Sequence, residues 1–444
     1  MKEKKIIKIK NIKKEIFTAP KGMRDVLGEQ YYYYQGFFEK AQEVAVYYGF
    51  QPIELPSLEQ EGVYTSSVGI GTDIVDKEMY TLRTKGNKDK LALRPEGTAG
   101  VVRAYIQNGM QSWSQPVMLY YYGSFFRHDK PQKGRLREFK SFGLEVLGTE
   151  KSIADAIIIH ITKTILEEAG GQNLYIKINS IGDKNCRAGY IKELTSYYKK
   201  HIKDLCTACK TRLKTNPLRL LDCKEPQCQP IKEEAPNSVG FLCGECKKHF
   251  KEVLEYLEEL QIPYQINKNL VRGLNYYTKT VFEITEEAEN SESQDDTKEA
   301  PLTIAAGGRY DYLGKALRGK QDIPAVGVQI GVDRVLITNW YKKLKPRIIK
   351  KPKIYFIQLG ADAKLKSLRI IEILRQAKIS ISQSISKDSL GGQLRSAEKL
   401  EVPYAIIFGQ KEALEDSVIV RNMENRSQET IKIENLTKHL KELK

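Results

Sequence analysis

The chain has 444 residues, and its 72 lysines and arginines against 56 aspartates and glutamates give a formal net charge of +16. An apolar fraction of 41% supports compact folding, and no apolar run reaches the roughly 18 residues of a membrane span, which excludes a membrane protein. The length predicts about three folding units, and the basic charge favours nucleic acid as a partner, with a solvated lysine-rich surface as the alternative.

The first predicted elements follow a lysine-rich N-terminal extension. Residues 1–16 contain seven lysines, which interrupt every apolar stretch and argue against a secretory signal. Residues 30–48 predict a helix, because apolar residues recur at helical spacing and Gly49 supplies a stop signal. Residues 50–55 alternate between apolar and polar side chains and predict a short strand that ends at Pro56.

Two longer β-rich stretches, residues 117–127 and 138–147, predict an antiparallel hairpin with a long basic loop. Side chains alternate between the two faces of a strand. In the second strand, this alternation assigns to a core face Phe142, Leu144 and Val146. The other face, whose small residues and single carboxylate predict the floor of a site, carries Phe139, Ser141, Gly143 and Glu145.

The same main unit continues beyond the hairpin. Cysteines, lysines and prolines mark residues 185–250 as an inserted subdomain, and the acidic composition of residues 286–300 predicts a disordered surface loop. The other predicted elements of this unit are a helix at 154–169, strands at 276–284 and 302–306, and a closing strand and helix at 325–341.

A second domain follows a linker. Prolines and lysines in residues 342–353 predict the linker, and residues 354–444 predict a small α/β domain with a mostly parallel sheet. Its predicted elements are strands at 354–359, 380–385 and 404–408, and helices around 365–374 and 390–400. No internal repeat is present.

Five short segments place charged or small residues at the ends of predicted strands and helices. Residues 126–139 hold arginines and lysines between aromatic rings, and planar guanidinium groups bind phosphate while a ring stacks on a base. Residues 93–100 offer a carboxylate and a hydroxyl suited to an ammonium group. In residues 272–277, 307–311 and 327–334, glycines permit close backbone approach. Each segment taken alone is more typical of an ordinary turn than of a binding site.

In order and spacing, these segments resemble the class II histidyl-tRNA synthetases, and the resemblance covers residues 17–444. Three parts resemble motifs 1, 2 and 3 of the class, the first of which forms the dimer interface: residues 30–56, 126–139 and 327–334. Residues 272–277 and 305–311 are similar to the two histidine-specific segments of the family. These two carry the specificity, because the three motifs are degenerate across the class.

The resemblance implies an α+β fold. A class II synthetase catalytic domain, an antiparallel sheet with helices, would span residues 17–341, and a C-terminal α/β anticodon-binding domain would span 354–444. It implies ATP-dependent activation of L-histidine to histidyl-adenylate and transfer to the 3′ end of tRNA(His), with Mg²⁺ as cofactor, by a cytoplasmic homodimer. Such chemistry needs positioning and charge neutralisation more than a protein nucleophile, which explains why the matched residues are arginines.

Carried over by position, the resemblance implies a set of site residues. Arg127 and Arg272 would be catalytic, bridging the α-phosphate of ATP and the carboxylate of histidine. Residues implied to bind histidine are Glu96, Gly97, Thr98, Arg127, Ser141, Glu145, Arg272, Tyr276, Tyr277 and Tyr310. Residues implied to bind ATP are Arg127, Asp129, Arg135, Phe139 and Arg334. Glu145 and Tyr277 would contact the two imidazole nitrogens, since an acceptor and a hydroxyl suit a ring with one N–H and one lone pair.

The cysteines of the insertion raise a separate hypothesis. Two pairs with CxxC spacing are what a closed tetrahedral Zn²⁺ site needs. They predict a site made of Cys206, Cys209, Cys243 and Cys246. The alternative is that the thiols are reduced and simply packed in the insertion. Both readings suit a reducing cytoplasm better than a disulfide framework does.

Two positions depart from the family pattern and keep two rival functions open. Ser141 stands where most relatives have a glutamine, and Asn275 stands where an aspartate is usual. One rival is a non-catalytic synthetase-like paralogue, such as the regulatory subunit of ATP phosphoribosyltransferase, and the other is an RNA-binding module without catalysis. Retention of Arg127, Arg272 and Arg334 argues against the first rival, and the histidine-specific segments argue against the second.

Overall fold

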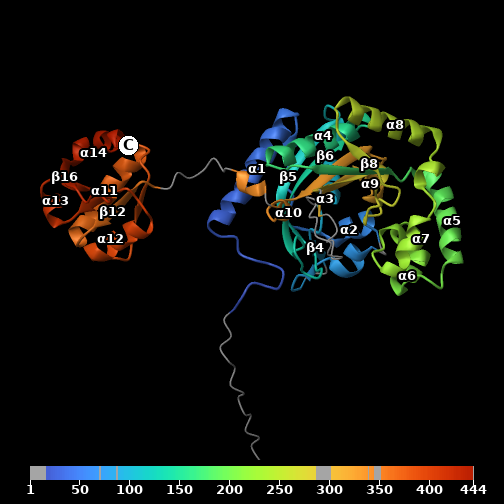
Figure 1. Ribbon diagram of the computed structural model, residues 1–444, viewed down its shortest axis with the longest axis horizontal. Coiled ribbons are helices and arrows are strands. Elements are labelled where there is room, and N and C mark those ends of the chain that lie inside the picture. The colour runs from blue at the N-terminus through green and yellow to red at the C-terminus, as the bar shows by residue number, and fades with distance from the viewer. Residues whose placement is uncertain are drawn as a thin grey trace, which may run out of the picture. The chain divides into compact units, whose positions relative to one another are not determined.

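The computed structural model describes residues 17–69, 72–86, 89–286, 302–338, 340–344 and 352–443. The predicted N-terminal extension lies outside the described residues, as do nearly all of the predicted acidic loop and most of the predicted linker. The chain divides into two compact units, Met1–Pro346 and Arg347–Lys444, and the division falls inside the predicted linker (Figure 1). In the part of the chain that the structure describes, no helix is both long enough and apolar enough to cross a membrane.

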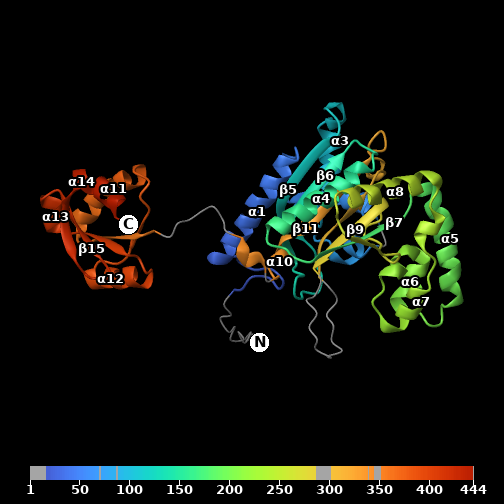
Figure 2. The same cartoon turned by 45° about the horizontal axis from the view of Figure 1, so that its top comes forward.

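An eight-stranded sheet is the framework of the first unit (Figure 2). Its strands are β1 (Gln51–Pro52), β5 (Val117–Phe126), β6 (Glu138–Leu147), β7 (Leu174–Ser180), β8 (Tyr264–Ile266), β9 (Thr278–Glu286), β10 (Thr303–Arg309) and β11 (Ala325–Gly331). They lie in the order β1-β5-β6-β11-β10-β9-β7-β8, and only the edge pairs β1–β5 and β7–β8 are parallel. The predicted hairpin is confirmed, because β5 and β6 pair antiparallel along their whole length.

The predicted strand at 50–55 is much shorter in the structure. Only Gln51 and Pro52 form β1, which pairs with β5. The physical reason is the proline content of this stretch, since proline has no N–H to give to a strand ladder and is confined to sheet edges.

Three helices cover one face of the sheet. They are α1 (Glu29–Tyr47), α4 (Ile153–Glu168) and α8 (Gly244–Glu259), and α4 contacts both of the others. The predicted core face of β6 is confirmed, because Phe142, Leu144 and Val146 are buried in the core shared with these helices. The predicted helices at 30–48 and 154–169 are confirmed to within a residue at each end.

Smaller elements and a second hydrophobic core lie on the opposite face. A three-stranded antiparallel sheet has the order β2-β4-β3. The elements that accompany it are β2 (Leu58–Gln60), β3 (Thr81–Arg83), β4 (Lys90–Leu93), α2 (Glu61–Ser67), α3 (Thr98–Gln107), α9 (Leu313–Ala316), the π-helix η1 (Ile74–Glu78) and the 3₁₀ helix η2 (Met110–Ser112). Two further short helices, α10 (Val332–Val335) and the 3₁₀ helix η6 (Trp340–Lys343), pack instead into the core that contains α1, α4 and α8. This small sheet was not predicted, since its strands are too short to show an alternating pattern.

The insertion leaves the sheet after β7 and returns to it through α8. Its helices are α5 (Lys184–Lys200), α6 (Thr207–Thr215), α7 (Gln229–Glu233) and the 3₁₀ turns η3 (Pro217–Asp222), η4 (Pro226–Cys228) and η5 (Ser238–Phe241). Figure 1 and Figure 2 both show α5, α6 and α7 gathered at one end of the unit. Helix α8 belongs to the main core, because Phe250, Val253 and Leu257 are buried there.

The second unit is a five-stranded sheet between helices. The strand order is β13-β12-β14-β15-β16, parallel among the first three and antiparallel at β15 and β16. Its elements are β12 (Ile354–Gln358), α11 (Ala361–Gln376), β13 (Ile381–Gln383), α12 (Leu390–Lys399), β14 (Tyr404–Phe408), α13 (Gln410–Leu414), β15 (Ser417–Asn422), β16 (Gln428–Lys432) and α14 (Ile433–Glu442). The α/β prediction is confirmed up to β14, and the antiparallel hairpin that follows was missed.

Candidate active site

The floor of the candidate site is the face of β6 that carries Glu145. Strand register places Glu145 directly opposite Gly327 of β11, and Gly143 directly opposite Tyr121 of β5. A Cβ atom at Gly327 would overlap Oε2 of Glu145 and lie 2.5 Å from its Cδ, and a Cβ atom at Gly143 would overlap the Tyr121 ring. The two glycines therefore provide the space in which a carboxylate and a phenol ring pack.

Three hydroxyl groups from three different elements converge on the carboxylate of Glu145, which is 0% exposed. Thr98, the first residue of α3, donates to Oε1 at 2.8 Å, and Tyr121 donates to the same oxygen at 3.2 Å. Tyr310, which follows β10, donates to Oε2. We call these four residues the Glu145 cluster. Tyr121 was missed by the sequence analysis, because only the hairpin register places it beside Glu145.

Burial raises the pKa of Glu145 from its ordinary value of 4.5 to about 8. The hydrogen bonds from Tyr310 and Thr98 act in the opposite direction and offset only part of that rise. The carboxyl group therefore changes its charge near neutral pH, close to the range in which an imidazole ring does so.

Replacing Glu145 by glutamine should make stability less dependent on pH. In the unfolded chain Glu145 loses its proton near 4.5 and in the folded protein near 8, so the folded state binds more protons and stability falls as pH rises between these values. We expect the unfolding temperature of Glu145→Gln to decline less than that of the unchanged protein over this pH interval. Glu255→Gln, an exposed position of α8, is the control and should leave the slope unchanged. If the unfolding temperature declined equally with pH in all three proteins, the raised pKa assigned to Glu145 would be contradicted.

The carboxylate of Glu96 is held at the start of α3. Its Oε2 accepts a hydrogen bond from the backbone N–H of Thr98 at 2.7 Å, and its Oε1 accepts from that of Ala99 at 2.9 Å. Such first-turn N–H groups have no partner within their own helix. Burial raises the pKa of Glu96, and these backbone hydrogen bonds oppose the rise. Gly97 separates these residues and leaves room for the Tyr121 ring, which a Cβ atom there would overlap.

Tyr276 connects Glu96 with two further tyrosines. Its hydroxyl donates to Oε2 of Glu96 at 3.3 Å. Its ring centroid lies 5.8 Å from that of Tyr310 and 4.7 Å from that of Tyr277. The guanidinium carbon of Arg272 lies 5.9 Å from the Tyr277 ring centroid. Residues predicted to bind histidine from three separate segments therefore lie in contact with one another.

Four arginines form a second group, which we call the arginine cluster: Arg127, Arg135, Arg272 and Arg334. Burial, followed by the positive charges of the other three, lowers the pKa of Arg334 to about 10. Guanidinium groups gathered in this way repel one another and favour binding of a polyanion such as a triphosphate. The guanidinium carbon of Arg127 lies 5.5 Å from the ring centroid of Phe139.

Arg272 is oriented by Glu283 of β9, which the sequence analysis missed. Its NH1 pairs with Oε1 of Glu283, whose Oε2 accepts from Thr303 of β10 at 3.3 Å. The Nε of Arg272 is buried and has no hydrogen-bond partner in the structure as described, so it is a donor available to a ligand. The available signal was the carboxylate of Glu283 between two apolar residues, Phe282 and Ile284, of the predicted strand 276–284.

The loop between β5 and β6 is closed by its own contacts and by α10. Arg135 pairs with Asp129 at 2.9 Å, and the backbone of Arg135 pairs with that of Gln132. Arg334 of α10 donates from Nε to the carbonyl of Gly134 at 3.1 Å. The segments that resemble motifs 2 and 3 are therefore in direct contact.

A buried network of ion pairs fixes the backbone next to Tyr310. Arg309 is 0% exposed, pairs with Asp155 of α4 and with Asp311 at 3.1 Å, and donates to the carbonyl of Thr149 at 2.9 Å. These contacts fix the end of β10 against α4, and with it the direction in which the chain presents Tyr310.

The two departures from the family pattern lie in different surroundings. Ser141 is 2% exposed and lies opposite Gly123 and Gly331 in the sheet. Asn275 accepts a hydrogen bond at Oδ1 from Nδ2 of Asn216 at 2.7 Å, which joins the predicted histidine-specific segment to the insertion.

The predicted zinc site of Cys206, Cys209, Cys243 and Cys246 is wrong, because the structure separates its two pairs. The first pair lies with Cys223 and Cys228, and the second pair lies with Asp183 and Cys186. All seven cysteines are free thiols. The two CxxC pairs begin different helices, α6 and α8, and spacing along the chain does not reveal which helix ends meet in space.

Mg²⁺ suits this site as a companion of ATP. Apart from the two cysteine groups, the described residues contain no set of three or more His, Cys, Asp or Glu side chains close enough to share a metal ion. Mg²⁺ commonly keeps several waters and binds through substrate phosphates with one or two carboxylates. An Mg²⁺ ion at this site would therefore need substrate phosphates as most of its ligands.

Comparison with known proteins gives matches along nearly the whole chain. The family model described as "Histidyl-tRNA synthetase" matches residues 22–335, and the one described as "Anticodon binding domain" matches residues 353–443. A protein of Dehalococcoides mccartyi named histidine–tRNA ligase is 39% identical over 426 residues, which cover 96% of this chain and 99% of that protein. One of the same name from Caldicellulosiruptor saccharolyticus is 39% identical over 424 residues, covering 95% and 98%.

Solved structures agree with these matches. The crystal structure of apo histidyl-tRNA synthetase from S. aureus has a TM-score of 0.75 and 29% sequence identity, and the match covers 96% of this chain and 100% of that one. The two-unit fold, the Glu145 cluster, the arginine cluster and similarity over nearly the full length together show that the chain belongs to the histidyl-tRNA synthetase family.

Proposed function

We propose that the chain is a ligase that activates L-histidine with ATP to form histidyl-adenylate and transfers the histidyl group to the 3′ end of tRNA(His). The observation that carries this proposal is the meeting of the two clusters. The hydroxyl of Tyr276 and the charge of Arg127 both act on Glu96, and the Tyr276 ring contacts Tyr310 of the Glu145 cluster. A pocket suited to imidazole therefore adjoins one suited to phosphates.

Histidine binds with its imidazole ring between Glu145 and Tyr277. Glu145 accepts the ring N–H, and the Tyr277 hydroxyl donates to the other nitrogen. Glu96 receives the α-ammonium group. Thr98 acts through Glu145, because its hydroxyl donates to that carboxylate. Ser141 lies on the same face of β6 as Glu145 and would contact the substrate, and Gly97 admits the ring of Tyr121, whose hydroxyl donates to Glu145.

In the first step, a carboxylate oxygen of histidine attacks the α-phosphorus of ATP, and the bond to the bridging oxygen breaks so that pyrophosphate leaves with its electron pair. Arg127 and Arg272 hold the α-phosphate and the histidine carboxylate together. Arg135, held by Asp129, and Arg334 bind the γ-phosphate, and Phe139 stacks on adenine. Bound Mg²⁺ supplies further neutralisation of phosphate charge. Positioning and fixed positive charge are the contributions that phosphoryl chemistry requires.

In the second step, a hydroxyl of the terminal adenosine of tRNA attacks the carbonyl carbon of the adenylate, and AMP leaves. The second unit, which matches an anticodon-binding domain, contacts the distant anticodon of the same tRNA. Contacts on that long polyanion account for part of the excess of basic residues.

We further propose a cytoplasmic homodimer in which α1 contributes to the interface. Tyr31, Val46 and Tyr47 of this helix are 53%, 53% and 84% exposed. A second copy of the chain packed along α1 would cover these exposed apolar side chains. The segment that contains them resembles the dimer-forming motif 1 of the class.

The test is histidine-dependent exchange of pyrophosphate into ATP by the purified full chain. We expect exchange with L-histidine and none above background with the other nineteen amino acids. A non-catalytic paralogue, which the full-length similarity to histidine–tRNA ligases does not favour, would give no exchange with any amino acid. Exchange with a different amino acid would contradict the assignment of the Glu145 cluster.

A further inference from the structure

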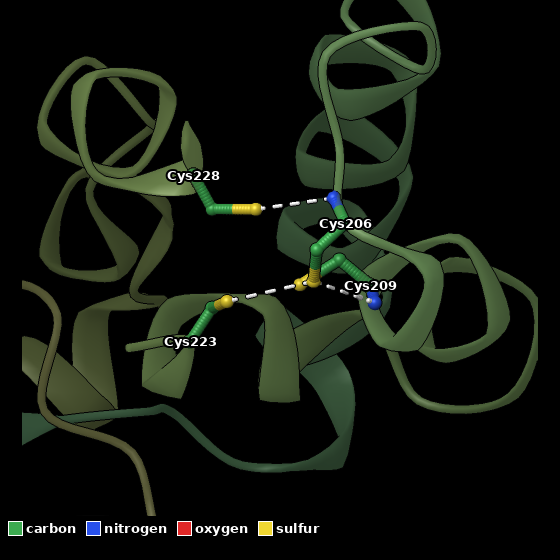
Figure 3. Close-up of side chains that lie close together, drawn as sticks. All are labelled: Cys206, Cys209, Cys223 and Cys228. Atoms are coloured by element: carbon green, nitrogen blue, oxygen red, sulfur yellow. Dashed lines mark hydrogen bonds between the residues drawn. The ribbon is translucent and has the colours of Figure 1, made fainter. Parts of the chain in front are cut away.

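The insertion holds a set of cysteines that the aminoacylation site does not use, which we call the four-cysteine group: Cys206, Cys209, Cys223 and Cys228. Their sulfur atoms all lie within 4.8 Å of one another, and Figure 3 shows the four side chains directed toward a common centre. Three of them are buried, and Cys206 is partly exposed. None is in a disulfide.

The spacing of the sulfur atoms matches a tetrahedral metal site. A Zn–S bond of about 2.3 Å places two sulfur ligands of a tetrahedron about 3.8 Å apart. The Sγ atoms of Cys206 and Cys223 are 3.9 Å apart. Along the chain, two residues separate Cys206 from Cys209 and four separate Cys223 from Cys228, and both gaps lie in the range that structural zinc sites use.

Backbone and charged groups around the four-cysteine group suit thiolate ligands. The N–H of Cys209 donates to Sγ of Cys206 at 3.4 Å, and the N–H of Cys206 donates to Sγ of Cys228 at 3.4 Å (Figure 3). Four thiolates and one Zn²⁺ carry two net negative charges, and the ammonium group of Lys232 contacts the carbonyl of Cys223 at 3.2 Å. Such surrounding donors orient and stabilise metal-bound sulfur.

We propose that the four-cysteine group binds one structural Zn²⁺ ion that orders the insertion. The ion would join three elements that also pack into the second hydrophobic core: the start of α6, the end of η3 and the turn η4. Because these segments are short, a metal cross-link would add to the stability that this packing supplies. Four protein ligands leave no open position, so the site has a structural and not a catalytic character.

The elements that the ion joins also support the catalytic unit. Arg219 of η3 pairs with Asp73 at the start of η1. Asn216, between α6 and η3, donates to Asn275 in the predicted histidine-specific segment at 2.7 Å. An insertion ordered by Zn²⁺ therefore positions one wall of the histidine pocket from outside.

The second cysteine group consists of Asp183, Cys186, Cys243 and Cys246. It serves as a control for zinc binding, because its ligand atoms are not all sulfur. Its acidic member, Asp183, caps α5, and Oδ1 accepts from the backbone N–H groups of Asn185 at 2.9 Å and Cys186 at 3.1 Å. The thiol of Cys186 also donates to this oxygen at 3.3 Å. The carboxylate is therefore satisfied without a metal, whereas the four-cysteine group offers only sulfur atoms as ligands.

Metal analysis of the full chain, purified without chelator from cells supplied with zinc, tests the assignment. We expect Cys223→Ser/Cys228→Ser to contain about one Zn²⁺ per chain less than the unchanged protein. The matched variant Cys243→Ser/Cys246→Ser should keep that ion. Absence of zinc from the unchanged protein, iron in its place, or loss of the ion only from the matched variant would each overturn the proposal.

Limited proteolysis tests the structural role without relying on a variant that folds. Trypsin sites at Lys210, Arg212, Lys214 and Arg219 lie between the ligands. Removing zinc from the unchanged protein with a chelator should speed cleavage there by about tenfold, because local unfolding exposes the chain, and added Zn²⁺ should restore protection. Unchanged cleavage after proven metal loss would overturn the ordering role, and neither result depends on aminoacylation.

Discussion

Replacing Arg272 by alanine should lower the rate of histidine-dependent pyrophosphate exchange by about 10²–10³-fold, the loss typical when one preorganised donor to a developing charge is removed. Arg272 has the position that this role requires: Glu283 fixes one end of its guanidinium group, and its buried Nε has no other partner among the described residues. Rates at saturating histidine and ATP measure the effect, since the loss should fall on kcat.

The control for this change is Arg375→Ala. Arg375 pairs with Glu372 on the exposed face of α11 and its side chain is 71% exposed, so we expect exchange within about twofold of the unchanged protein. Loss of the Arg272–Glu283 pair should also lower stability, because both side chains are about four-fifths buried and Glu283 would keep its charge without a partner. Circular dichroism must therefore show that the Arg272→Ala protein is folded before its exchange rate is compared. Near-normal exchange by a folded Arg272→Ala protein would refute the assigned role.

Replacing Gly327 by alanine should both destabilise the first unit and abolish exchange. The new Cβ atom would overlap Oε2 of Glu145 and lie 2.9 Å from the carbonyl oxygen of Leu144. Glu145 cannot move aside, because it is fully buried and held by three hydroxyl groups. We expect a cost of about 3 kcal/mol in the free energy of unfolding, at the upper end for overpacking a core.

Two further variants separate the steric effect of a Cβ atom at Gly327 from the effect that any replacement of glycine by alanine would have. Gly189→Ala makes the same chemical change on the exposed side of α5, where a Cβ atom meets nothing within 4 Å, and should be neutral or slightly stabilising. The double variant Gly327→Ala/Glu145→Ala removes the overlapping carboxylate, so denaturation should show recovered stability while exchange stays absent. A double variant no more stable than Gly327→Ala alone would contradict the steric account.

Much of the fold could be predicted because long patterns depend on local physics. The hairpin of β5 and β6 and the helix α4 follow from sustained apolar periodicity, which one window of sequence contains. The short strands β2, β3 and β4 escaped prediction, because strands of three or four residues cannot display a period. The hairpin of β15 and β16 was missed for a different reason: the alternating strands before it suggested a parallel continuation.

The residues of the candidate site also divide into those that the sequence predicted and those that it missed. Residues at segment ends with a clear chemical type, such as Arg127 and Glu96, were predicted through their resemblance to family motifs. Tyr121 and Glu283 were not, since each acts through a partner from another strand or segment. Register decides which side chains face each other across a sheet, and a shift of one residue would reverse every face.

The amino-acid sequence by itself determined the family, the α+β class and the residue types that phosphate and imidazole recognition require, because these depend on order, spacing and local patterns. Only the tertiary structure decided which distant residues meet. It placed Gly327 opposite Glu145, gave Arg272 its partner Glu283, and divided the cysteines into two groups that CxxC spacing had joined incorrectly. The reason is physical: contacts between distant segments are set by sheet register and helix packing, which no single stretch of the chain encodes.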